Sequence, residues 1–314
     1  MSENSTQYRM EEKPENFDSF WDLEVEKLKQ LPAKYTLATA PFVSPIANCF
    51  DLCFESFDKS KIHAQYLRPK CAVKEKTPVL LMFHGYTWNA GSYAQKLQYV
   101  SLGYSVLAMD CRGQSGASAD NACTNGNTVF GHILRGIEGN AENLYYFKTF
   151  LDTAMLAKIA LSMEETDSTK LCTLGDSQGG ALSLVCAALV PHISRTVCYY
   201  PFLCNYALAV QQPSPTAYDE ILQYFKRADP LHLKEKEVFR KLAYIDVRFF
   251  VSRIKAEVLW LQGAKDTQCP PITQAQAFEN INSKKEMLIY PEYGHEIMPD
   301  SYDRIYAFLQ RPYP

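Results

Sequence analysis

A serine flanked by glycines is the strongest chemical signal in the sequence. It is Ser177, within the run GDSQG at 175–179. This G-x-S-x-G pattern is typical of a nucleophile elbow, a sharp strand-to-helix turn that exposes the serine hydroxyl. An apolar run at 171–174 precedes it and another at 179–190 follows, as such a turn requires. We therefore predict a catalytic nucleophile at Ser177, rather than a glycine-rich turn without chemistry.

A serine is a weak nucleophile without a base and an orienting carboxylate, which in such sites follow it in the order Asp or Glu, then His. His295 follows the apolar run at 285–290, so we predict that it is the base rather than a surface histidine. Asp266 follows the run at 258–261, and we predict that it orients His295 rather than capping a turn. Asp246 is the alternative, but it precedes that run. The other histidines outside this connection are interpreted as structural or exposed: His63, His132, His192 and His232.

Ester or amide cleavage through a serine also needs backbone N–H groups that receive the negative oxygen of the intermediate. We expect one donor at Gln178, the residue after the nucleophile. The second should come from the loop after the apolar run at 79–83, where Gly85 permits close approach and Tyr86 is the expected donor. Each donor is typically worth about 3 to 4 kcal/mol in the transition state. In the same loop, His84 is expected to brace the backbone rather than act as a base.

A second glycine-containing tract, DCRGQSG at 110–116, does not have the spacing of a phosphate-binding P-loop. We interpret it as a structural turn after a strand. Its Arg112 is expected to pair with a carboxylate near the site, and Glu296, beside His295, is one candidate.

Short apolar runs alternate with helical patterns over more than two hundred residues. Runs nearly free of charge suit strands that are covered on both faces, and they lie at 79–83, 105–109, 171–174, 197–200, 258–261 and 285–290. Helical patterns lie at 16–30, 95–102, 142–161 and 179–190, and residues 48–57 appear extended. This alternation predicts an α/β fold with a mostly parallel sheet flanked by helices.

One stretch interrupts this alternation. Residues 205–253 carry several prolines and many charges but no convincing strand. We expect a helical insertion within a single domain of residues 1–314. Such an insertion is either a cap over the site or an oligomer contact, and the sequence favours neither.

Composition excludes several classes of protein. Of 314 residues, 47% are hydrophobic and 21% are charged, and the net charge is −3, which argues for a globular protein and against nucleic-acid binding. The N-terminal residues do not resemble a secretory signal, and no apolar stretch approaches the roughly 20 residues of a membrane helix. The ten cysteines show no C-x-x-C pair or zinc-binding set. We expect reduced cysteines, a cytoplasmic location, no membrane partner and no metal or other cofactor.

Further motifs make the sequence similar to carbohydrate esterase family seven, the acetyl xylan esterases and cephalosporin C deacetylases. The family's R-G-Q, S-Q-G-G and H-E motifs have counterparts at 112–114, 177–180 and 295–296. Other similarities, in chain order, are Phe20-Trp21, RGI at 135–137, PFLC at 201–204, YIDV at 244–247 and CPP at 269–271. The resemblance therefore spans nearly the whole chain.

The resemblance implies an α/β-hydrolase fold, a triad of Ser177, Asp266 and His295, and an oxyanion hole from Tyr86 and Gln178. It also implies short acetylated xylo-oligosaccharides or cephalosporin C as substrates, no cofactor, and a homo-oligomer, commonly a ring-like hexamer. Two positions depart from the family pattern where glycine is usual, namely Asp176 and Ser115. Asp176 adds a carboxylate beside the nucleophile, which bears on the pH optimum and on charged substrates.

Together these features predict a serine esterase that deacetylates small carbohydrate esters through an acetyl-enzyme, with Tyr86 and Pro270 contacting the substrate. The same triad would also serve a general short-chain esterase, a thioesterase or a peptidase, because a fold does not determine its substrate. The alternative that is not an enzyme is an inactive hydrolase-like scaffold that binds a partner.

Overall fold

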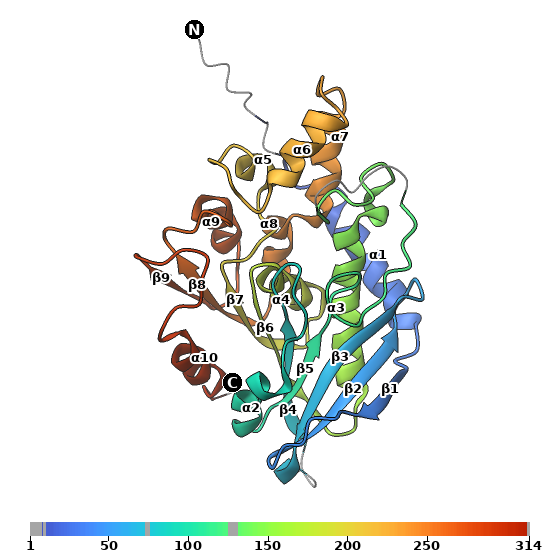
Figure 1. Ribbon diagram of the computed structural model, residues 1–314, viewed down its shortest axis with the longest axis vertical. Helices are drawn as coiled ribbons and strands as arrows, with labels where there is room; N and C mark the ends of the chain where they lie inside the picture. Colours follow the sequence, from blue (N-terminus) through green and yellow to red (C-terminus); the bar gives the residue numbers. More distant parts are fainter. Residues whose placement is uncertain (1–7, 9–10, 73–75, 125–130, 313–314) are drawn as a thin grey trace.

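The computed structural model describes residue 8 and residues 11–72, 76–124 and 131–312. These residues form one nine-stranded sheet (Figure 1). Its strands are β1 (Tyr35–Thr39), β2 (Ala47–Glu55), β3 (Lys61–Pro69), β4 (Thr77–Phe83), β5 (Ser105–Met109), β6 (Thr166–Asp176), β7 (Ile193–Tyr199), β8 (Glu257–Gly263) and β9 (Lys285–Tyr290).

The sheet joins an antiparallel edge to a parallel core. Its strand order is β1-β2-β3-β5-β4-β6-β7-β8-β9, and every pair from β5 onward in this order is parallel. The six strands expected from charge-poor apolar runs are these parallel strands, which confirms the α/β class. The sequence analysis did not identify β1 and β3, which lie in the antiparallel part.

Helices cover both faces of the sheet. They are α1 (Phe17–Gln30), α2 (Tyr93–Ser101), α3 (Tyr145–Ser162), α4 (Gln178–Leu189), α5 (Tyr206–Ala209), α6 (Asp219–Arg227), α7 (Glu235–Leu242), α8 (Val247–Phe250), α9 (Pro271–Glu279) and α10 (Ser301–Leu309), with 3₁₀ turns η1 (Lys70–Ala72), η2 (Ala141–Asn143), η3 (Ala243–Ile245) and η4 (Val251–Arg253). The larger hydrophobic core contains residues of α1, α3, α4 and α8, and a second core holds α2 and α10 against the opposite face. The sheet thus separates two cores.

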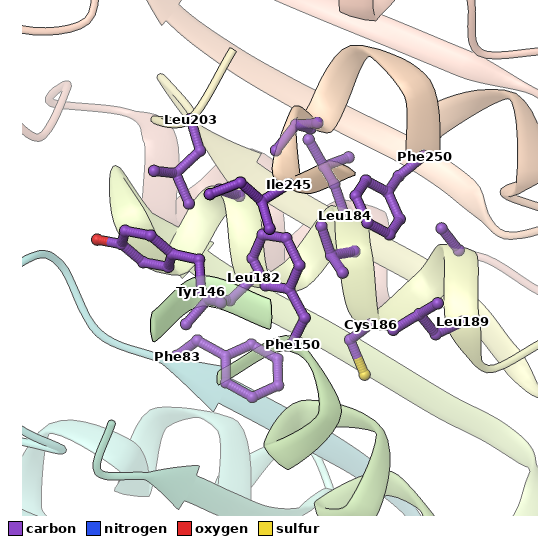
Figure 2. Packing of buried hydrophobic residues seen from close by; sticks show 14 of the residues in the cluster. Phe83, Tyr146, Phe150, Leu182, Leu184, Cys186, Leu189, Leu203, Ile245 and Phe250 are labelled. Carbon is purple, nitrogen blue, oxygen red and sulfur yellow. The ribbon is translucent and has the colours of Figure 1, made fainter. Parts of the chain in front are cut away.

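The helix that follows the predicted nucleophile lies at the centre of the larger core. Every residue of α4 is buried, as its all-round apolar pattern predicts. Figure 2 shows Leu182 and Leu184 of α4 close to Phe150 of α3 and Phe250 of α8. Because α4 is enclosed on all sides, the turn that begins it has a fixed position in the fold.

The first helix docks across elements that are distant in sequence. Trp21 of α1 is fully buried, its ring lies 5.1 Å from that of Phe147 in α3, and its indole N–H donates to the carbonyl of Tyr244 at 3.0 Å. The apolar stripe that predicts docking of this helix is confirmed. Since Tyr244 belongs to η3, α1 holds the segment between β7 and β8 against the core.

The segment 205–253 is helical, as expected, and it connects β7 to β8. It contains α5 to α8 with η3 and η4, and its residues form no strand. In Figure 1, α5, α6 and α7 project above the sheet, while α8 lies lower beside α4.

The cysteines, the helices and the possible metal-binding side chains complete the description of the fold. All ten cysteines are free thiols. Within the described ranges, no helix is long and apolar enough to cross a bilayer. In the same ranges, no group of histidine, cysteine and carboxylate side chains is arranged to hold a metal ion.

Candidate active site

The turn between β6 and α4 forces an unusual backbone conformation on Ser177. Its φ is +53°, which non-glycine residues rarely adopt. The turn is fixed because the Ser177 N–H donates to the carbonyl of Tyr199 at 3.0 Å and its carbonyl accepts from the N–H of Phe202. A β-carbon on Gly179 would lie 2.0 Å from the carbonyl oxygen of Phe83, so only glycine fits there. The local sequence and the packing together produce the sharp turn expected of a nucleophile elbow.

Asp266 and His295 form a hydrogen-bonded pair at the carboxyl ends of β8 and β9. Nδ1 of His295 lies 2.8 Å from Oδ2 of Asp266, whose side chain is fully buried. The other carboxylate oxygen accepts the N–H groups of Gln268 and Cys269, each at 2.9 Å. Because the buried carboxylate holds the proton on Nδ1, Nε2 of His295 is left as the nitrogen that can accept one.

Close packing brings these two residues beside the elbow. The side chain of Ser177 interacts with the thiol of Cys269, whose own N–H donates to Asp266. The ring of Tyr200, one residue beyond the end of β7, lies 4.3 Å from the ring of His295. Ser177, Asp266 and His295 are therefore gathered at one edge of the sheet.

The alternative carboxylate, Asp246, lies elsewhere and has another task. It caps the N-terminus of α8, and its Oδ2 lies 2.8 Å from Nη2 of Arg248. It also accepts the N–H of Asn205. Both residues of the ion pair are buried, so Asp246 is a structural carboxylate within the insertion.

The two expected oxyanion donors lie at the carboxyl end of β4 and at the start of α4. In the part of the chain that the structure describes, neither the Tyr86 N–H nor the Gln178 N–H is used in a hydrogen bond to the protein. His84 braces this region as expected: its Nε2 accepts the Cys111 N–H at 2.9 Å and its Nδ1 donates to the Gly85 carbonyl at 2.7 Å. The loop is therefore held while its N–H group stays available.

The sequence analysis gave no role to Gln114, which connects these two elements. Its Oε1 accepts the Thr87 N–H at 2.9 Å, and its Nε2 donates to Oε1 of Gln178 at 2.7 Å. The Nε2 of Gln178 points back to Oε1 of Gln114 at 3.3 Å. Thr87, at φ +63°, follows Tyr86 directly. Gln114 therefore links Gln178 to the residue that follows Tyr86, and thus the two expected donors to each other. Its place in the R-G-Q motif is the signal that marks it.

The expected pairing of Arg112 with Glu296 is wrong. Arg112 is fully buried and binds Asp152 of α3 through two nitrogens, each at 2.7 Å, and Asp58 at 2.6 Å. Glu296 is exposed and accepts the Gly294 N–H instead. Arg112 pairs with Asp152 rather than Glu296 because a buried carboxylate needs a cationic partner more than an exposed one does.

The insertion contributes a cavity wall beside Tyr86. A cavity of about 420 Å³ is lined by Tyr86 and by Thr216, Ala217, Asp219, Glu220, Gln223 and Arg227. Oε1 of Glu220 accepts the Leu134 N–H at 2.9 Å. Burial raises the pKa of Glu220 to about 7, although backbone N–H groups at 132–134 oppose the shift. Residues 216–227 of the insertion therefore form part of the wall of the cavity that Tyr86 lines.

The remaining histidines are structural or exposed, as expected. His63 lies between two carboxylates, 2.7 Å from Asp110 and 3.0 Å from Asp51. His132 stacks on Tyr145, His232 pairs with Glu235, and His192 is exposed.

Pro270, expected to contact substrate, is buried at the start of α9. It follows Cys269, the residue that interacts with the Ser177 side chain.

Comparison with known proteins identifies the family of the chain. A model of the acetyl xylan esterase family matches residues 2–312. Acetyl xylan esterase 1 from Thermoanaerobacterium sp. JW/SL YS485 is 42% identical, with a TM-score of 0.91 and coverage of 98% of both chains. An acetyl xylan esterase from Paenibacillus sp. R4 is 30% identical, with a TM-score of 0.91 and coverage of 99% of both chains.

A curated relative is longer. Acetyl esterase Axe7A of Xylanibacter ruminicola is 25% identical over 288 residues, which cover 90% of this chain but 63% of that protein. This chain thus spans less than two thirds of that relative's length. The family match across nearly the whole chain and the two solved structures establish an α/β-hydrolase fold, and the chain belongs to the acetyl xylan esterase family.

Proposed function

We propose that this protein is a serine esterase that removes acetyl groups from small acetylated carbohydrates, with acetylated xylo-oligosaccharides as the first candidates and cephalosporin C as a further one. The observation that carries the proposal is the hydrogen bond of 2.8 Å between Asp266 and His295 beside the strained turn at Ser177. Membership of the acetyl xylan esterase family supports the choice of acetyl and sugar groups.

In the proposed reaction, Oγ of Ser177 attacks the acetyl carbonyl carbon while Nε2 of His295 takes the hydroxyl proton. The carbonyl oxygen becomes an oxyanion and accepts the N–H groups of Tyr86 and Gln178. Collapse of this tetrahedral intermediate breaks the bond between the acetyl carbon and the sugar oxygen. The sugar oxygen receives the proton from His295, and an acetyl-enzyme remains.

The second half returns the enzyme to its starting state. His295 takes a proton from water as the water oxygen attacks the acetyl carbon, and the same N–H groups receive the second oxyanion. Collapse releases acetic acid and returns the proton to Oγ of Ser177. Throughout, Asp266 keeps the imidazole oriented and stabilises its protonated form.

The wider proposal includes roles for other parts of the chain. Glu220 and the cavity that it shares with Tyr86 support a cap made by the segment 205–253. We also propose that Pro270, next to Cys269, helps to shape the substrate pocket. Hexameric assembly and a cytoplasmic location stay predictions.

The test is acetate release from acetylated xylo-oligosaccharides, measured beside p-nitrophenyl acetate and butyrate. We expect fast release from the sugar, preference for acetyl over butyryl, and a loss of kcat of roughly six orders of magnitude in Ser177→Ala. A Ser177→Ala variant that keeps a tenth of the activity would contradict the nucleophile. Hydrolysis of the nitrophenyl esters alone would keep the nucleophile and contradict the sugar substrate.

A further inference from the structure

Two neighbouring cavities lie beside the nucleophile elbow. One of about 260 Å³ is lined on the elbow side by Gly175 and Asp176, and the other of about 320 Å³ by Gly85 and Asp176. They share the lining residues Met82, Phe83, Ala90, Gln95 and Asp176. We call the two together the elbow groove. It borders both the oxyanion loop and the residue next to Ser177.

Asp176 is the acidic group of this groove. Within the described residues, no other residue donates a hydrogen bond to its carboxylate, and His295 is the charged side chain that lowers its pKa. Its Oδ2 lies 2.9 Å from the position that a β-carbon on Gly85 would occupy. Burial raises the pKa of Asp176, because the charged form loses water, and this outweighs the opposing effects of His295 and of the residue's own backbone N–H. A ligand hydroxyl in the groove would supply the missing hydrogen bond.

The groove also offers hydrogen-bond donors. Asn89 and Gln95 use their amide oxygens to accept the N–H groups of Gly91 and Ser92, at 2.8 and 3.1 Å. In the described part of the chain, their amide nitrogens donate to nothing, so these N–H groups are available to a ligand.

Aromatic and apolar side chains form the rim. Trp88 is 71% exposed and lines the larger cavity, while Tyr302 and Ile297, 47% and 44% exposed, line the smaller one. Exposed aromatic rings beside polar groups suit a molecule with apolar faces and hydroxyl edges, as a pyranose has. The combined volume is in the range of about 300 to 1,000 Å³ that small-molecule sites occupy.

The other charged group in the groove is Lys96 of α2. Its ammonium is buried and donates to the carbonyl oxygens of Ala90 and Ser92, the latter at 2.9 Å. Burial lowers the pKa of Lys96 to about 8. Lys96 therefore holds the loop that forms the groove wall, and its charge is directed to that loop.

We propose that the elbow groove binds the sugar part of the ester and that Asp176 makes the site select neutral, hydroxyl-bearing acetates over anionic ones. A sugar hydroxyl would donate to Asp176 while Trp88 packs on the ring, whereas a carboxylate in the groove would face the charge of Asp176. This inference rests on the proposed function and adds the chemical class of the alcohol.

The kinetic test compares three acetyl esters in the wild type and in Asp176→Asn. They are a neutral acetylated xylobiose, cephalosporin C, which carries carboxylates, and p-nitrophenyl acetate, which has no sugar. We expect Asp176→Asn to lower kcat/KM about tenfold for the neutral sugar, mainly through a higher KM. For cephalosporin C we expect kcat/KM to rise several-fold. For the nitrophenyl ester, kcat/KM should change less than threefold. Asp303→Asn, an exposed carboxylate outside both cavities, is the matched control and should change none of the three.

An equal change on all three esters would overturn the inference, because Asp176 would then act through His295. A preference of the wild type for the anionic ester that Lys96→Met abolishes would overturn it too, since Lys96 would govern the groove.

A binding test separates this inference from the proposed function. In Ser177→Ala, calorimetry measures acetylated xylobiose without turnover, and we expect addition of Trp88→Ala or Asp176→Asn to weaken binding about tenfold. Trp88 is largely exposed, so its removal leaves the fold intact. If neither change weakens binding, or if the sugar does not bind, the groove is not the sugar site. A wild type that binds the sugar but releases no acetate would contradict the proposed function alone.

Discussion

Gln114 and Gln178 face each other through their side-chain amides, with nitrogen-to-oxygen distances of 2.7 and 3.3 Å in the two directions. One residue comes from the turn after β5 and the other from the first position of α4. Because Gln114 also accepts the N–H of Thr87, this amide pair sets the separation between the two expected oxyanion donors.

Replacement of Gln114 should therefore slow the chemical step. Gln114→Met leaves the Thr87 N–H without its acceptor and removes the contact with Gln178, whose amide keeps Tyr146 and the His84 carbonyl as partners. We expect kcat to fall about 10- to 100-fold with KM little changed, because donor placement matters in the transition state. Affinity for a boronic acid inhibitor that mimics the intermediate should fall in parallel. Gln310→Met, at an exposed position, is the control. A rise in KM at unchanged kcat would contradict the positioning role.

Asp266 and Asp246 give opposite expectations for the same substitution. Asp266→Asn should lower kcat about 10⁴-fold, because an amide cannot hold the proton on Nδ1 of His295. Asp246→Asn should instead lower the free energy of unfolding by about 3 to 5 kcal/mol, since it breaks a buried pair with Arg248. Urea unfolding and kcat per folded molecule separate the two effects. A large loss of kcat in Asp246→Asn and a loss of stability alone in Asp266→Asn would contradict the assignment, because Asp246 would then be the residue that orients His295.

The buried pair of Arg112 and Asp152 should control stability. Asp152→Asn leaves the guanidinium without its fully buried partner, and we expect a loss of about 3 to 5 kcal/mol in the free energy of unfolding. Replacement of both residues, as in Arg112→Met with Asp152→Leu, should recover part of that loss. Glu296→Gln, at the surface, should change stability by less than about 0.5 kcal/mol. A larger loss of stability in Glu296→Gln would indicate that Glu296 does pair with Arg112.

His63 should make stability depend on pH. Asp110 and Asp51 raise its pKa above the ordinary value of 6.5, against the effect of burial. Protonated His63 therefore contributes fully to the free energy of unfolding below pH 6.5. This contribution is lost as the pH rises through the raised pKa of His63 in the folded state. We expect His63→Gln to lower the free energy of unfolding more at pH 6 than at pH 9, by urea titration. His192→Gln, at the surface, should lose nothing at either pH. Equal losses of His63→Gln at both pH values would contradict the charged pairing.

The sequence predicts the parallel core well because buried parallel strands need continuous apolar runs. It does not reveal β3, since this strand carries Lys61, His63 and Arg68 and its burial alternates. The short edge strand β1 is mostly exposed and has no apolar run. Antiparallel strands whose residues alternate in burial or are mostly exposed thus do not produce the apolar runs that identify buried parallel strands.

Within the candidate site, the order of the residues along the chain predicts that Asp266 and His295 lie in contact, and they do. Arg112 was misplaced because its partner, Asp152, depends on how α3 crosses the sheet. A lone aspartate within the apolar run of α3 was the available signal. The contact of Gln114 with Gln178 could not be predicted, because it depends on a loop approaching the elbow from 64 positions away.

The docking of α1 has a consequence for biosynthesis. The indole of Trp21 bonds to the carbonyl of Tyr244, 223 positions later, and its ring lies 5.0 Å from that of Phe250. While the ribosome is still producing the middle of the chain, the apolar stripe of α1 has no complete surface to cover it. During this time the aromatic side chains of α1 are exposed and can form non-native contacts. Contacts between residues this distant in sequence also form slowly. Helix α1 is thus made long before the residues that it packs against, and it reaches its final packing late.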